Sequence, residues 1–183
     1  MRRAISTGVA AAVATMFAVS AGAQTTTQTG SGKGGSPHVK TAWQINGANI
    51  SIEYGRPSIK GRSESQMMPN GLEWRTGADE ATVLTSDKPL VFGTVSLVPG
   101  SYTINTRPGA TEWKLILGKL DKVGQWGVPY LPALEIGRTP MKLGRSPAHV
   151  EQVTYSIEPS ATGGTLRIEW GTTSVTTQFT IGK

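Results

Sequence analysis

Apolar and polar residues alternate along most of this chain, and that alternation limits the possible fold more than any other feature. Ile50, Ile52 and Tyr54 are separated by Ser51 and Glu53. The same period of two recurs at residues 102–106, 113–117, 153–157, 166–170 and 175–181. Because successive side chains of a strand point to opposite faces, the pattern predicts antiparallel strands with one face on a core and the other in water.

Turn-forming residues separate these segments. Asn46-Gly47 lies between residues 39–45 and 50–54, which predicts a hairpin. Gly171-Thr172 is expected to form a turn between the last two strands. The chain contains 23 Gly and 11 Pro, a composition that disfavours long helical bundles. We therefore predict an all-β fold, an antiparallel β-sandwich or jelly-roll-like arrangement of about 8–10 strands.

Two long stretches, at residues 55–79 and 118–147, do not follow the alternation. Connections of this length in a compact domain are usually functional or partly disordered. Four prolines make a helix unfavourable in the second stretch. We therefore expect two long loops, the second of them an irregular flap over the sheet.

The first residues have the composition of an export signal. Arg2 and Arg3 precede an apolar stretch at residues 9–19, which is followed by Ala-Gly-Ala at residues 21–23. This order of basic, apolar and small residues predicts a secretory signal peptide at residues 1–23. Its removal predicts a periplasmic or extracellular protein. No membrane span is expected in the mature chain, because no later segment has the roughly 18 apolar residues that a span needs.

The rest of the chain is expected to contain a linker and one domain. Residues 24–36 are rich in Thr, Gly and Ser and carry one charged side chain, which predicts a flexible linker. Residues 37–183 are expected to form a single β-sandwich domain. Without the signal peptide, 16 basic and 12 acidic side chains remain. They form no basic run with interleaved aromatic residues, so nucleic acid is not expected as a partner.

Several classes of active site find no support in the sequence. There is no Cys, which excludes disulfides and thiolate metal ligands. His38 and His149 are the only histidines and lie 111 positions apart, so no metal site is predicted. The chain has neither the G-x-S-x-G turn of many hydrolases nor the glycine-rich loops of nucleotide-binding proteins. No cofactor is therefore expected.

Short blocks spread over the chain carry a family resemblance. They read YGRPSIKGR at residues 54–62, WRTGADEAT at 74–82, PGSY at 99–102, EW at 112–113 and QWG at 125–127. These blocks resemble the signatures of the bacterial domain-of-unknown-function family 2911 (DUF2911), from about Ser36 to Ile181. In that family Asn is usual where this chain has Asp79, so the chain carries an added negative charge beside Glu80. The resemblance implies a secreted, envelope-associated domain with no assigned activity.

Charged residues gather in the first long loop, and most of them lie next to Gly or Pro. Loops held by a rigid sheet are common places for binding sites. A guanidinium group offers a fork of donors to a carboxylate, phosphate or sugar, while a carboxylate offers acceptors. An ion pair between Arg75 and Glu80 that merely closes the loop needs the same residue types, so a structural role stays open. The predicted ligand-binding residues are Arg56, Lys60, Arg62, Trp74, Arg75 and Glu80.

The candidates for catalysis are Glu80, Asp79 and Arg75. Asp79 and Glu80 are adjacent, and adjacent residues of a strand point to opposite faces, so they are expected to make a poor catalytic pair. A glycosidase needs two carboxyl groups on either side of one bond. The possible distant partners of Glu80 are Glu53, Glu73 and Glu169.

Four of the five Trp residues divide into two groups. Trp113 and Trp170 fit the inward phase of their strands and are predicted to lie in the core. Trp74 and Trp126 lie in the long loops and are candidates for a ligand-stacking wall, although a loop Trp also often covers the edge of a core.

Three functions remain open from the sequence. The leading hypothesis is a secreted envelope protein that binds a polar or anionic ligand without catalysis. The second is a hydrolase of an envelope glycan or ester that uses Glu80 with Arg75. The third is a structural or interaction protein. A pocket holding Glu80 with a second carboxylate would favour the hydrolase, and an open groove with an exposed Trp would favour the binding protein.

Overall fold

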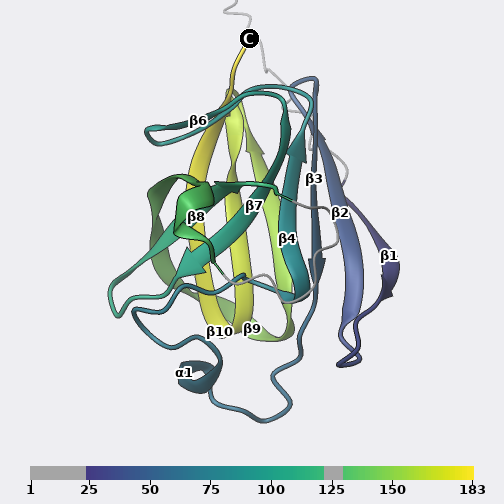
Figure 1. Cartoon of the computed structure of the whole chain (residues 1–183), viewed down its shortest axis with the longest axis vertical. Helices are drawn as coiled ribbons and strands as arrows, with labels where there is room; N and C mark the ends of the chain where they lie inside the picture. Colours follow the sequence, from purple (N-terminus) through teal and green to yellow (C-terminus); the bar gives the residue numbers. More distant parts are fainter. Residues whose placement is uncertain (1–23, 122–129) are drawn as a thin grey trace, which may run out of the picture.

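A computed structural model describes residues 24–121 and 130–183 of the chain (Figure 1). In these residues ten strands form one antiparallel sheet, in the order β1-β2-β3-β4-β7-β8-β9-β10-β5-β6. The prediction of an all-β antiparallel fold is therefore confirmed. The predicted signal peptide at residues 1–23 and Trp126 lie outside the described residues.

The helical content is small. One short α-helix, α1 (Glu64–Met67), and one 3₁₀ turn, η1 (Pro132–Leu134), interrupt the strands. None of the described helices is long and apolar enough to cross a membrane. The strands are β1 (Thr25–Ser31), β2 (Pro37–Ile45), β3 (Ala48–Gly55), β4 (Ala78–Ser86), β5 (Leu90–Phe92), β6 (Val95–Leu97), β7 (Gly100–Arg107), β8 (Glu112–Lys119), β9 (Glu135–Ser160) and β10 (Gly163–Ile181).

The sheet folds over on itself and encloses one core. Figure 1 shows β9 and β10 behind β4 and β7, so the sheet forms two layers. Although β3 and β9 are not neighbours in the sheet, the rings of Tyr54 and Tyr155 meet edge to face with centroids 4.5 Å apart. The sheet is not closed into a barrel, because β1 and β6 stand at opposite ends of the strand order.

The predicted hairpin between residues 39–45 and 50–54 is confirmed. Ile45 pairs with Ala48, which leaves a two-residue turn between β2 and β3. Both turn residues have positive φ, 50° at Asn46 and 79° at Gly47. This geometry matches the right-handed twist of the two strands, and Asn-Gly is the dipeptide that adopts it most readily.

The segment predicted as a flexible linker contributes a strand. Thr25–Ser31 forms β1 and pairs with β2, although all seven side chains are exposed. The pairing uses backbone groups, and the β-branched Thr residues favour an extended chain. Composition indicates only that such a segment has no apolar face to bury, which does not exclude an edge strand.

The stretch 118–147 also differs from the expected irregular flap. Residues from Glu135 onward belong to β9, which continues to Ser160. Pro140 lies where β9 pairs with β8 alone, and Pro147 lies at a register shift against β10. A missing N–H is tolerated at such positions, so these prolines do not end the strand.

The turn expected at Gly171-Thr172 is instead a bulge within a continuous β10. The register of β10 against β9 shifts on both sides of Gly171, whose φ is +64°. A glycine with positive φ bends a strand without ending it, so one long strand replaces the two that the sequence predicted.

Candidate functional site

A bulge at the start of β4 places two carboxylates side by side. Glu53 pairs with Val83 and Gly55 with Ala78, so β4 has extra residues between its paired positions. Asp79 lies in this bulge with φ +63°. The expectation that Asp79 and Glu80 point to opposite faces is wrong, because the left-handed conformation of Asp79 breaks the two-residue alternation of the strand.

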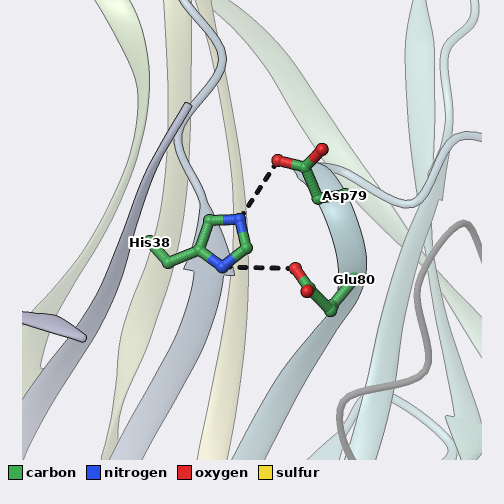
Figure 2. Close-up of side chains that lie close together, drawn as sticks. All are labelled: His38, Asp79 and Glu80. Carbon is green, nitrogen blue, oxygen red and sulfur yellow. Dashed lines mark hydrogen bonds and ion pairs between the residues drawn. The ribbon is translucent and has the colours of Figure 1, made fainter. Parts of the chain in front are cut away.

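Both carboxylates face His38, which lies on β2 (Figure 2). His38 Nε2 lies 3.1 Å from Asp79 Oδ2, and His38 Nδ1 lies 3.2 Å from Glu80 Oε2. The side chains are 18% exposed for His38, 10% for Asp79 and 34% for Glu80. This His38–Asp79–Glu80 cluster therefore stands at the border between core and solvent.

A buried hydrogen-bond network fixes the chain that leads into the bulge. Thr76 has φ 55°, which is uncommon for a β-branched residue. Its carbonyl accepts hydrogen bonds from Tyr155 Oη at 2.8 Å and from Thr82 Oγ1 at 3.3 Å. The hydroxyls of Thr76 and Thr106 lie 2.9 Å apart. These contacts hold the backbone three residues before Asp79, so the carboxylates are carried on a rigid support.

The connection between β1 and β2 passes over the cluster at Gly32. A Cβ at this position would stand 1.7 Å from Asp79 Oδ2 and 2.8 Å from His38 Nε2. A side chain at this position would have to displace Asp79 or His38, because the backbone of Gly32 packs directly against the pair. The segment that was predicted to be a linker thus forms one wall of the cluster.

A pocket of about 330 Å³ opens beside the cluster. Its lining includes His38, Glu80 and a further carboxylate, Glu53. Hydroxyl groups also line it, among them those of Thr85 and Ser101, which lie 2.8 Å apart. None of the described residues that line the pocket is Lys or Arg. The pocket is therefore acidic and rich in hydrogen-bond acceptors.

Two of the predicted ligand-binding arginines are held by internal hydrogen bonds. Arg56 donates to the Val153 carbonyl at 3.0 Å and to Thr154 Oγ1 at 2.9 Å. Arg62 donates to the carbonyls of Ile59 and Ser58 in its own loop. These bonds tie the first long loop to β9 and close it on itself.

The remaining predicted residues are dispersed. The exposed Lys60 donates its backbone N–H to Glu151. Trp74 stacks on the core residue Trp170 with ring centroids 5.4 Å apart. Arg75 lines a separate small hollow of about 30 Å³, and the ion pairs found in the described part of the chain do not join it to Glu80. Among the predicted site residues that the structure describes, only Asp79 and Glu80 come together.

His38 is the residue that the sequence failed to point to. It pairs with Gly55 in the register of β2 and β3, and Gly55 pairs with Ala78 of β4. These two register positions place His38 beside a carboxylate 41 residues away. One feature of the sequence was compatible with the bulge. Asp79 is of a residue type that tolerates positive φ better than most.

The cluster has the composition of a small metal site. His38, Asp79 and Glu80 each offer one ligand atom, and the three atoms lie within 4.8 Å of one another. The expectation that the chain has no metal site was based on the separation of its two histidines. That separation has no bearing on a site built from one histidine and two adjacent carboxylates.

Comparison with known proteins places the chain in a family. A family model described as a protein of unknown function (DUF2911) matches residues 36–179. This match spans most of the chain, so the chain belongs to that family, as the sequence blocks indicated. No curated protein and no solved structure matches the chain.

Proposed function

We propose that this DUF2911 domain binds a small polar ligand that carries a positive charge, in the pocket beside His38. The observation that carries the proposal is the acidic lining, in which Glu53 and Glu80 stand with His38 and several hydroxyls. Carboxylates accept hydrogen bonds from an ammonium or guanidinium group, and hydroxyls add contacts to a polar body.

This proposal keeps the binding function expected from the sequence but changes the charge of the ligand. An anionic ligand would need cationic donors, and Arg56 and Arg62 already donate to backbone and hydroxyl oxygens of the protein. The volume of about 330 Å³ is near the lower end for small-molecule pockets. A compact amine with several hydroxyls fits both the size and the acceptors.

The test is a binding panel with matched ligands. We expect polyhydroxylated amines to raise the melting temperature of the protein, while the corresponding neutral and anionic compounds leave it unchanged. Glu53→Gln should weaken amine binding about tenfold or more, because it removes one charged acceptor. Glu158→Gln, at an exposed position outside the pocket, is the matched control. Binding of the anionic members alone would contradict the proposal.

A hydrolase is the second candidate, because a pocket that holds Glu80 with a second carboxylate is the feature that the sequence analysis expects of a hydrolase. Glu80 and Glu53 line the same pocket, and the imidazole of His38 stands beside them. Such a set supplies the acid and base groups that hydrolysis requires. Turnover of a glycan or ester library that disappears in Glu80→Gln would support catalysis. Binding of these compounds without turnover would support a binding function only.

The cellular location is also a proposal. The basic, apolar and small-residue regions within residues 1–23 support export to the periplasm or the exterior. We expect the chain to be recovered outside the cytoplasm with Gln24 at its N-terminus. Recovery of the whole chain, still starting at Met1, in the cytoplasmic fraction would contradict this.

A further inference from the structure

We propose that His38, Asp79 and Glu80 bind one divalent transition-metal ion, of the kind represented by Zn²⁺. The inference deepens the proposed function and rests on it only in that both use the pocket beside His38. The ion would hold the inner side of a ligand site whose remaining wall carries Glu53 and the hydroxyls.

The spacing of the three side chains suits a single ion. The Nε2–Oδ2 distance between His38 and Asp79 is 3.1 Å. Two ligand atoms that each lie about 2.0–2.2 Å from a tetrahedral ion are separated by roughly 3.3–3.6 Å, so the pair would open slightly to hold one. Glu80 lies against Nδ1, the other ring nitrogen of His38 (Figure 2), with an oxygen within 4.8 Å of the other two ligand atoms. It would bind the same ion as Nε2 and Asp79 after rotation of its side chain.

One carboxylate oxygen of the cluster lacks a hydrogen-bond partner. Glu80 Oε2 is buried and accepts no hydrogen bond in the described part of the chain. Its 3.2 Å approach to His38 Nδ1 is an ion-pair distance, but it lacks hydrogen-bond geometry. A buried acceptor without a partner is costly. A cation bound at Oε2 would remove that cost, so this oxygen is an independent indication of a positive ligand.

The net negative charge of the cluster also favours a bound cation. Two carboxylates with one imidazole carry a net charge of −2 when His38 is neutral and −1 when it is protonated. The side chain of Asp79 is only 10% exposed, so water screens this charge poorly. A divalent ion brings the local charge close to zero, which lowers the cost of holding two adjacent carboxylates together.

The ligand types select the class of ion. An imidazole nitrogen with carboxylate oxygens suits Zn²⁺ and neighbouring transition metals, whereas Mg²⁺ and Ca²⁺ prefer oxygen ligands alone. Three protein ligands leave a tetrahedral ion with one open position. The pocket that His38 and Glu80 line would supply water or a ligand group at that position.

The experiment starts from the purified, untagged chain after a chelator has removed any bound metal. Zn²⁺ is then titrated into this chain in a calorimeter. We expect one Zn²⁺ per chain, and a visible absorption band when Co²⁺ replaces it. Mg²⁺ at the same concentration should give no heat. His38→Gln and Glu80→Gln should each weaken Zn²⁺ binding at least tenfold. Circular dichroism of each variant checks that the sheet is retained, and the second variant decides if the first does not fold.

The other histidine provides a matched control. His149 Nε2 lies 3.2 Å from Glu151 Oε2, the same separation as in the cluster, but both side chains are more than half exposed. His149→Gln should leave Zn²⁺ binding unchanged. The proposal is overturned if the wild-type chain binds no Zn²⁺, or if binding is lost in His149→Gln and kept in His38→Gln.

A parallel arm separates this inference from the proposed function. The stripped chain is titrated with the amine panel in the presence of a chelator. Amine binding without Zn²⁺ binding would overturn the metal site and leave the proposed function standing. Zn²⁺ binding without amine binding would support the metal site and remove the proposed function.

Discussion

The backbone of one residue, Asp79, decides whether a cluster exists. A φ of +63° costs most residues about 1–2 kcal/mol, and Asp tolerates it better than most. If Asp79 had ordinary strand geometry, its carboxylate would point away from Glu80. The cluster therefore depends on a conformation that the surrounding contacts impose, such as those that hold Thr76.

Replacement of Asp79 by Ala and by Gly isolates this conformation. Both changes remove the carboxylate, but only Ala carries a Cβ that clashes in the left-handed region. We expect Asp79→Ala to be less stable than Asp79→Gly by about 1 kcal/mol in urea unfolding. Thr85, in the regularly paired part of β4, is the control, and there the Gly variant should be the less stable. If the Gly variant is the less stable one at both positions, Asp79 does not have a left-handed backbone.

Among the elements, α1 is fixed to the sheet through one carboxylate. Glu64 accepts hydrogen bonds from the Thr172 backbone N–H at 2.6 Å and from the hydroxyls of Thr172 and Thr173. Burial alone would raise the pKa of Glu64, but these hydrogen bonds outweigh it and hold the pKa below the ordinary value of about 4.5. The short helix lies at the end of the molecule away from the C-terminus (Figure 1).

The lowered pKa of Glu64 predicts an acid-dependent contribution to stability. A carboxylate with a depressed pKa stabilises the fold above its unfolded pKa, and this contribution is lost as pH falls through its folded pKa. Glu64→Gln should therefore lower the free energy of unfolding by about 1–2 kcal/mol at pH 7, after allowance for partial exposure. The deficit should shrink toward pH 3.

Urea unfolding of the wild-type and Glu64→Gln chains at pH 7 and pH 3 measures the loss of unfolding free energy at each pH. Glu158→Gln, at an exposed position, should change the free energy of unfolding by less than about 0.5 kcal/mol at either pH. A Glu64→Gln deficit that grows as the pH falls would show that its hydrogen bonds do not favour the charged form.

The packing of the β1–β2 connection on the cluster leads to a second prediction about stability. A methyl group at Gly32 would overlap Asp79 Oδ2, whereas a Cβ at Gly30 meets nothing within 4 Å. Gly32→Ala should therefore cost about 1–3 kcal/mol, the usual range for overpacking. Gly30→Ala should change the free energy of unfolding by less than about 0.5 kcal/mol. Equal effects in thermal or urea unfolding would mean that this connection does not pack on the cluster.

At the scale of the whole molecule, the sequence predicts the fold class better than the site. The period-two alternation is local and identified β3 correctly, and the Asn-Gly dipeptide identified the β2–β3 turn. The site depends on contacts that alternation does not encode. His38 reaches Asp79 only through the register of three strands and a bulge, and Arg56 is held by a strand almost a hundred residues away. The sequence shows which charged residues are present, but it does not show which residues they contact in the fold.

The extent of the core defines the folding unit. Every buried hydrophobic residue of the described chain lies between Val39 and Phe179, which agrees with the family match at residues 36–179. Strand β1 lies outside this range and is exposed along its length. It contributes backbone pairing to β2 but buries little apolar surface. Gln24, just before the strand, accepts a hydrogen bond from Trp43 Nε1 at 3.2 Å.

Removal of residues 1–31 should therefore leave a protein that still folds cooperatively. We expect one unfolding transition with a lower midpoint than that of a chain lacking only residues 1–23, because the pairing of β1 with β2 is lost. The outer edge of β2 then presents unpaired backbone groups that another copy can extend. Light scattering should show association that rises with concentration in the shorter chain and not in the longer one. Loss of the cooperative transition would instead make β1 part of the folding unit.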